Sequence, residues 1–432
     1  MKKMSFLLAI VLLLSFCFGG CGQPQPNPKL DDLNLLCETL ETEHYDLYAN
    51  ISEEEFQAER EKIARQTPNM TDAEFYWSVR HLLSLVGDAH TAAYPSDYFM
   101  SVLPWSIKKF DEGWFILILD KAHEQYLGTR VVAINDLPID EVVERTRQVV
   151  SYEADTWLWQ KAPDVLGWKE ALEYLDIVEP DEPVLVTVET AQGTEETFEL
   201  PAYDDWSEEK KQEVLVGFQR DSVPVTAEQD AIYWSTALDE NTYFIQYNSC
   251  KEDPDLPMAQ FVQQVEADLE SGGYQNLIID LRYNSGGNSE VIRPLEQTLS
   301  LYAINAGSDV QFYILIGGRT FSSATIAATD FKKTTIGNSI FVGQPTGGVL
   351  ICPGNINTIR IENPPFGVQY STKFFDLLGG QEGPLMPDYT VPQPFAQYAK
   401  GGMRRSPTST KTCCSSPAPI HKTTHNTRRI TR

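Results

Sequence analysis

The sequence is poor in the side chains that usually form metal or cofactor sites. Its 432 residues include seven cysteines and six histidines. The five cysteines after residue 21 are odd in number and widely spaced, which argues against both a disulfide framework and a zinc site. The chain also lacks a Walker loop, a dinucleotide fingerprint and an internal repeat. We therefore expect neither a metal nor an organic cofactor.

Positive charge is also scarce. The chain has 34 Lys and Arg against 61 Asp and Glu, and its formal net charge is −27. Seven of the basic residues lie in residues 401–432, which contain no acidic residue, so the rest of the chain is more acidic still. This balance argues against nucleic acid as a partner and suits a soluble extracellular domain.

Long apolar runs are absent except at the amino terminus. Lys2 and Lys3 precede the apolar residues 6–16, a pattern typical of a secretory signal and too short to span a bilayer comfortably. Gly19-Gly20-Cys21 resembles a bacterial lipobox, with Phe18 in place of the usual leucine. We expect a mature chain that begins at an acylated Cys21 and is lipid-anchored to the outer face of the bacterial cell membrane. A plain signal peptide with an incidental cysteine is the alternative.

The remaining sequence changes character several times. Residues 30–100 read as helices, with capping boxes at Ser52 and Thr71. Residues 101–205 contain strand patterns at 113–119 and 129–135, a helix at 139–149 and a hairpin at 184–200. Residues 206–398 alternate strands and helices as in an α/β domain. The predicted organisation is a signal peptide at 1–21, a tether at 22–29, these three regions, and a disordered basic tail at 399–432.

One serine stands at a strand-to-helix turn. An apolar strand, 312–316, is followed by Gly317-Gly318, and an alanine-rich helix then spans 324–331. A serine here lies beside free backbone N–H groups at a positive helix end, where an acyl-transfer nucleophile would be useful. The alternative is that Ser322 or Ser323 only caps the helix.

Two further segments carry candidate site residues. The strand 277–281 runs into a polar loop that ends in two glycines, and those glycines let backbone N–H groups point into a site. His90 lies in the small polar segment 87–91, where it could serve as a general base near neutral pH. The alternatives are an ordinary polar turn and a structural histidine.

Together these segments resemble one family. Gly87-Asp-Ala-His-Thr91, Asp280-Leu-Arg-Tyr-Asn-Ser-Gly-Gly287 and Arg319-Thr-Phe-Ser-Ser-Ala324 follow the order of the carboxyl-terminal processing (tail-specific) serine proteases. The resemblance is closer to the branch with the tricorn core protease and the interphotoreceptor retinoid-binding protein. It covers about residues 30–395. It implies an α/β fold: a crotonase-like βαβ spiral as catalytic core, an N-terminal helical cap and a PDZ-like β-rich insert.

The resemblance also implies roles for individual residues. It makes Ser322 the nucleophile, His90 the general base and Glu382 the carboxylate that orients the histidine, with Asp376 as a rival carboxylate. The oxyanion hole would use the N–H of Ser323 with that of Gly286 or Gly287. No lysine occurs in 344–348, so a Ser-His-Glu arrangement is favoured over a Ser-Lys dyad. The supporting residues would be Asp88, Asp280, Arg282 and Asn284, and an Asp280–Arg282 ion pair would shape the glycine loop.

The predicted function is that of an exported serine-type peptidase working through an acyl-enzyme on peptides or unfolded proteins. A non-catalytic peptide- or lipid-binding protein on the same scaffold is the alternative, and an esterase is a third candidate. The stretch 127–139 resembles part of a PDZ module but lacks a clear Gly-Leu-Gly carboxylate loop, so a substrate-binding and a structural insert both remain open. The aromatic segment 157–168 is expected to serve packing rather than a binding rim.

Overall fold

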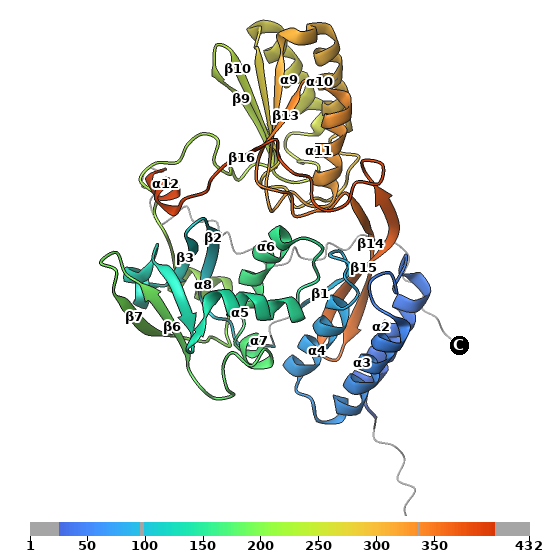
Figure 1. Ribbon diagram of the computed structural model, residues 1–432, viewed down its shortest axis with the longest axis vertical. Helices are drawn as coiled ribbons and strands as arrows, with labels where there is room; N and C mark the ends of the chain where they lie inside the picture. Colours follow the sequence, from blue (N-terminus) through green and yellow to red (C-terminus); the bar gives the residue numbers. More distant parts are fainter. Residues whose placement is uncertain (1–25, 96–98, 336, 402–432) are drawn as a thin grey trace, which may run out of the picture.

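The computed structural model describes residues 26–95, 99–335 and 337–401, which form three sheets with helices around them (Figure 1). The predicted signal peptide, Cys21 and residues 402–432 lie outside this range. Helix α2 (Pro28–Glu43) begins inside the predicted tether, and helix α12 (Phe395–Lys400) ends inside the predicted tail. Within the described residues, no helix has the length and apolar character needed to cross a membrane.

The amino-terminal helices pack against a long hairpin from the other end of the chain. Helices α3 (Glu53–Gln66) and α4 (Asp72–Ser84) begin at the predicted capping boxes, with reciprocal side-chain and backbone bonds at Ser52 and Thr71. Strands β14 (Ile351–Glu362) and β15 (Pro365–Asp376) form the hairpin, and β15 pairs antiparallel with β1 (Ala92–Pro95). Strand β1 follows His90 directly, so this pairing fixes the histidine segment.

A second, antiparallel sheet follows in the chain. Its order is β2-β3-β4-β6-β7, with bounds Ser106–Phe110, Gly113–Asp120, Arg130–Ile134, Val184–Glu189 and Glu195–Leu200. The short strands β5 (Leu137–Pro138) and β8 (Leu215–Gly217) pair with β4 and β3. These strands agree with the predicted strands and hairpin. The PDZ-like assignment of the region stays a prediction.

Four helices accompany this sheet. They are α5 (Ile139–Arg145), α6 (Asp155–Val165), α7 (Lys169–Tyr174) and α8 (Glu208–Val214). The predicted helix at 139–149 stops at Arg145 and continues as a tight turn over Thr146–Gln148. The Thr146 hydroxyl donates to the Val143 carbonyl at 2.6 Å, a local side-chain bond that competes with regular helix continuation.

The third sheet is the α/β part of the molecule, drawn at the top of Figure 1. Its order is β16-β13-β12-β11-β10-β9, and every neighbouring pair is parallel except β10–β9. The strands span Tyr389–Thr390, Ser339–Gly343, Gln311–Ile316, Asn276–Asp280, Thr242–Tyr247 and Tyr233–Asp239. Helices α9 (Met258–Gly272), α10 (Arg293–Ala306) and α11 (Ser323–Thr334) connect or flank them. The mixed α/β fold is confirmed, and the crotonase-like description stays a prediction.

This topology determines which loops meet. The carboxyl ends of the parallel strands β11 and β12 share one sheet edge, so the glycine loop and the Ser322 turn become neighbours. A cavity of about 1350 Å³ opens there, and its lining includes His90, Gly286, Ser322 and Trp157. Residues far apart in the chain therefore surround one space.

Candidate active site

Ser322 has a backbone conformation that is unusual for a residue with a side chain. It precedes helix α11 with φ 54° and ψ −125°. A non-glycine residue in such a region costs about 1–3 kcal/mol, and such strain clusters at functional sites. The Ser322 side chain makes no capping hydrogen bond, so the hydroxyl does not serve the helix. The structure thus removes the simple N-cap alternative for Ser322.

The side chain of the next residue, Ser323, forms a structural hydrogen bond. The Ser323 hydroxyl donates to the Gly287 carbonyl at 2.7 Å, which ties the helix start to the glycine loop. The strained turn is held by its backbone: the Ser322 carbonyl accepts from Thr325 N at 2.8 Å and from Ile326 N at 3.1 Å. The Ser322 side chain, half-buried, lines the cavity.

Asn284 fixes the glycine loop against this turn. Its buried side chain donates to the Tyr247 carbonyl at 2.9 Å and accepts from Gly286 N at 2.9 Å. Its carbonyl accepts from Phe321 N at 3.1 Å. A Cβ at Gly286, where φ is +100°, would lie 2.8 Å from Ser322 Cβ. Only glycine therefore allows the loop to lie this close to Ser322.

The loop and the helix start offer two backbone donors. Gly286 N–H is occupied by Asn284. Ser323 is the first residue of α11, where N–H groups lack an intrahelical acceptor. Within the described part of the chain, no hydrogen bond is found for Gly287 N–H either. Of the three predicted oxyanion donors, Gly286 is therefore the one whose N–H is already bonded within the protein.

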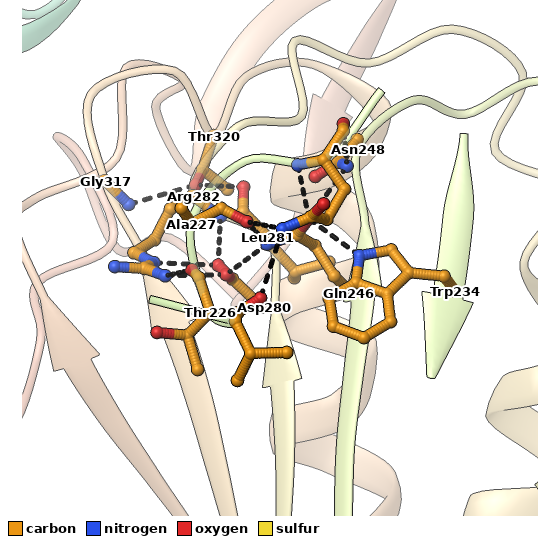
Figure 2. Close-up of polar contacts among 12 residues, drawn as sticks. Thr226, Ala227, Trp234, Gln246, Asn248, Asp280, Leu281, Arg282, Gly317 and Thr320 are labelled. Atoms are coloured by element: carbon orange, nitrogen blue, oxygen red, sulfur yellow. Dashed lines mark hydrogen bonds and ion pairs between the residues drawn. The ribbon is translucent and has the colours of Figure 1, made fainter. Parts of the chain in front are cut away.

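Asp280 and Arg282 form the predicted ion pair under the loop (Figure 2). Asp280 is fully buried, and both of its oxygens accept from the Arg282 guanidinium, at 2.9 and 2.7 Å. Gln246 adds a third bond to Asp280 at 3.1 Å. Beside this pair, the Thr320 hydroxyl donates to the Leu281 carbonyl at 2.8 Å and accepts from Gly317 N. These bonds join the end of β11 to the turn that carries Ser322, so the pair's role is structural.

His90 approaches the serine turn through an aromatic contact. Its ring is 94% buried and stacks on Phe321, with centroids 4.6 Å apart. Phe321 in turn stacks on Trp157 at 3.8 Å. The segment 157–168 was expected to serve packing, and Trp157 does so in the cavity wall. The stack places the histidine beside the residue that precedes Ser322.

Asp88 is the carboxylate anchored closest to this ring. It accepts from His90 N–H at 2.8 Å, from Thr91 Oγ1 at 2.5 Å and from His44 Nε2 at 3.2 Å. Its Oδ1 lies 3.7 Å from His90 Nδ1. Burial opposes its ionisation, but the hydrogen bonds from His44 and His90 and the His90 charge hold the pKa of Asp88 well below its usual range.

Glu153 is a site residue that the sequence did not reveal. Burial, with the charge of Asp88 adding to it, raises the pKa of Glu153 to about 9, against a smaller opposing effect of the Ala89 N–H. Ligand atoms of Asp88, His90 and Glu153 all lie within 4.8 Å of one another. The segment 151–155 belongs to no motif, and only the fold brings Glu153 to the histidine. The contact of His44 with Asp88 could not be predicted for the same reason.

Glu382 is the predicted orienting carboxylate. Its side chain is exposed in the loop after β15. No hydrogen bond or ion pair of Glu382 is found in the portion of the chain that the structure describes. The rival Asp376 is also exposed, and its carboxylate accepts from Gly380 N at 2.9 Å within its own turn. The role predicted for Glu382 stays a prediction.

Comparison with known proteins connects this arrangement to one fold. No family model and no curated protein matches the sequence. Among solved structures, mature CPAF matches with a TM-score of 0.58 and 12% identity, over 87% of this chain and 94% of that chain. Mature CPAF complexed with lactacystin gives 0.56 and 12%, over 86% and 95%. A further match is the photosystem II D1 C-terminal processing protease, with 0.38 and 13%, over 86% and 96%. The matches to mature CPAF show a shared fold.

Proposed function

We propose that this chain is an exported, lipid-anchored serine peptidase that hydrolyses peptide bonds through an acyl-enzyme on Ser322. The observation that carries the proposal is the strained turn at Ser322, whose hydroxyl faces a cavity and caps nothing. Backbone strain at a residue whose side chain does not cap a helix is typical of a nucleophile that the surrounding structure holds in position. The shared fold is evidence for the architecture, and the proposed activity is argued from the residues of the site.

The chemistry follows from the neighbouring groups. Ser322 Oγ attacks the substrate carbonyl while His90 accepts its proton, and His90 then donates this proton to the leaving amine. The N–H groups of Ser323 and Gly287 stabilise the oxyanion, each worth about 10²–10³-fold in rate. Water enters next, and His90 activates it to release the acyl group. Each of these steps uses only residues that line one cavity or its edge.

Two carboxylates compete for the role of orienting His90. Asp88 is buried and 3.7 Å from the ring nitrogen, whereas Glu382 is the residue that the family resemblance selects. Asp88→Asn should lower kcat by up to about 10⁴-fold if Asp88 stabilises the imidazolium, with Glu382→Gln nearly unchanged. The reverse result would assign the role to Glu382 and retain the Ser-His-Glu arrangement.

The substrate, the location and the remaining architecture belong to the same proposal. The cavity of about 1350 Å³ has room for an extended peptide, as expected for peptide or unfolded-protein substrates. We assign the sheet β16-β13-β12-β11-β10-β9 to a crotonase-like core and the sheet β2-β3-β4-β6-β7 to a PDZ-like domain. A Cys21→Ala chain should leave the membrane fraction, and one that stays membrane-bound would contradict lipid anchoring.

A fluorophosphonate probe tests the central claim. The wild-type chain should be labelled covalently at Ser322, and Ser322→Ala should lose the label. Ser106→Ala is a matched control, because Ser106 also lines the cavity and is half-buried. His90→Gln should nearly abolish labelling, whereas His81→Gln, outside the cavity, should not. Cleavage of an unfolded peptide by Ser322→Ala would refute the assignment.

The cavity lining favours one alternative, a binding protein without catalysis. Trp105, Trp168 and Trp206 all line the same space, which gives it large apolar surfaces for a ligand. Absence of labelling together with tight retention of an apolar peptide or lipid would support that function. Turnover of an activated ester without peptide cleavage would support the third candidate, an esterase.

A further inference from the structure

Three side chains around the His90 ring have ligand atoms that lie close together. They belong to Asp88, His90 and Glu153, and these atoms lie within 4.8 Å of one another. His90 Nδ1 and Glu153 Oε2 are both buried, and neither has a hydrogen-bond partner in the part of the chain that the structure describes. Buried polar atoms are normally paired, so two orphans around one small gap require an explanation.

Neighbouring residues hold the side chains of Asp88 and His90 in place. Asp88 Oδ2 accepts from His44 and Thr91, and Asp88 Oδ1 accepts from the backbone N–H of His90. The His90 ring cannot easily turn away, because it stacks on Phe321. The ligand atoms are therefore positioned in advance.

Histidines are the basic partners of this site. Within the described residues, Asp88 pairs with His44 and His90, and neither Asp88 nor Glu153 pairs with a lysine or arginine. Two carboxyl groups and an imidazole, with no lysine or arginine among them, form a set of ligands that suits a divalent transition metal.

We propose that Asp88, His90 and Glu153 bind a divalent ion of the zinc class, and that this ion switches the peptidase off. This inference rests on the proposed function of His90 as general base. One imidazole nitrogen and two carboxylate oxygens supply three of the four ligands of a tetrahedral zinc site. Ligands at about 2.0–2.1 Å from zinc lie about 3.4 Å apart, and His90 Nδ1 is 3.7 Å from Asp88 Oδ1. This pair needs to close by only a few tenths of an ångström, and the Glu153 oxygen lies within 4.8 Å of both ligand atoms.

Metal binding at this nitrogen removes the base by simple proton accounting. A neutral imidazole carries one proton on one of its two nitrogens. When Nδ1 of His90 gives its lone pair to the metal, that proton must reside on Nε2. A protonated Nε2 cannot accept the hydroxyl proton of Ser322, so the acylation step stops. Magnesium and calcium fit poorly, because they prefer more oxygen ligands and no imidazole.

The sequence did not predict this site because its ligands do not share a short spacing. Asp88 and His90 are two residues apart, but Glu153 comes from the segment before α6. The tail supplies a competing set of ligands, Cys413, Cys414, His421 and His425, outside the described residues. Any test must therefore identify the residue that binds the metal.

Modification of His90 by diethyl pyrocarbonate, read by mass spectrometry of its peptide, gives that resolution. The full chain is stripped with a chelator and treated with or without Zn²⁺. Zinc should protect His90 in the wild type, and Glu153→Gln should raise the zinc concentration needed by at least about tenfold. Glu61→Gln, an exposed carboxylate on α3, should behave as wild type. A cobalt-loaded chain should show tetrahedral visible absorption that Asp88→Asn diminishes.

The outcomes separate this inference from the proposed function. If metal-free enzyme cleaves peptide and zinc neither protects His90 nor inhibits, the metal site is refuted and the peptidase stands. If zinc protects His90 but the metal-free chain has no peptidase activity, the metal site is supported. Its role in switching off a peptidase is then refuted together with the proposed function. Equal zinc protection in wild type and Glu153→Gln would refute the three-ligand site without any appeal to misfolding.

Discussion

The strain at Ser322 makes a prediction about stability that needs no substrate. Replacing Ser322 by glycine removes the side chain from a backbone with φ 54° and ψ −125°, whereas alanine keeps a Cβ there. Both variants lack the nucleophile and should be inactive. They should differ in their free energies of unfolding, because glycine adopts positive φ without steric cost.

The magnitude follows from two opposing terms. The strained conformation costs about 1–3 kcal/mol for a residue with a Cβ. Glycine loses about 0.4–1 kcal/mol through the greater conformational entropy of the unfolded chain. The difference predicts that Ser322→Gly is more stable than Ser322→Ala by up to about 2.6 kcal/mol. Ser322→Ala itself should match wild type closely, since the hydroxyl makes no capping bond.

A second position in the same cavity provides the control. Ser106 begins strand β2, where glycine is expected to be less stable than alanine by about 0.5–1 kcal/mol. Urea unfolding followed by circular dichroism should therefore give opposite signs for the Gly-minus-Ala difference at positions 322 and 106. Equal signs at the two positions would show that Ser322 is not strained, and the main support for its catalytic role would be lost.

Two further predictions concern the loop and a buried acid. Gly286→Ala should reduce activity about 10²–10³-fold by displacing the oxyanion loop, because its Cβ would lie 2.8 Å from Ser322 Cβ. Gly193→Ala, at φ +75° with open space, should lose only about 1–2 kcal/mol of stability and no activity in a peptide assay. Burial and nearby negative charge raise the pKa of Glu296 to about 7, above its unfolded value near 4.5. Wild type should therefore lose stability as pH rises from about 4.5 to about 7. Over that pH window, the free energy of unfolding of Glu296→Gln should rise relative to that of wild type, by at most about 3 kcal/mol. Urea midpoints at pH 4.5 and 8 measure this gain, and Glu270→Gln, at an exposed position of α9, should show none.

The local elements were largely predictable. The capping boxes at Ser52 and Thr71, the strand before Gly317 and the alanine-rich helix after Ser323 all appear close to their predicted bounds. These features depend on side-chain periodicity and on hydrogen bonds within a few residues, and a sequence displays both directly. The Asp280–Arg282 pair was predictable for the same reason, since its partners are two residues apart.

The long-range contacts that bring the site residues together could not be predicted from the sequence. Glu153 and His44 reach Asp88 through contacts across 65 and 44 positions of chain, and no local pattern marks them. The sequence likewise could not show that the side chain of Asn284 occupies the Gly286 N–H. Such facts depend on which atoms compete for the same partner in three dimensions.

The sequence by itself determined the chemical types at the site, a serine at a helix start, a histidine in a small polar turn and a pair of glycines. Tertiary structure alone decided the strain at Ser322, the burial of Asp88 and the unpaired atoms of His90 and Glu153. The reason is physical: periodicity and turn propensity act over a few residues, whereas desolvation and backbone strain are set by everything that packs around an atom.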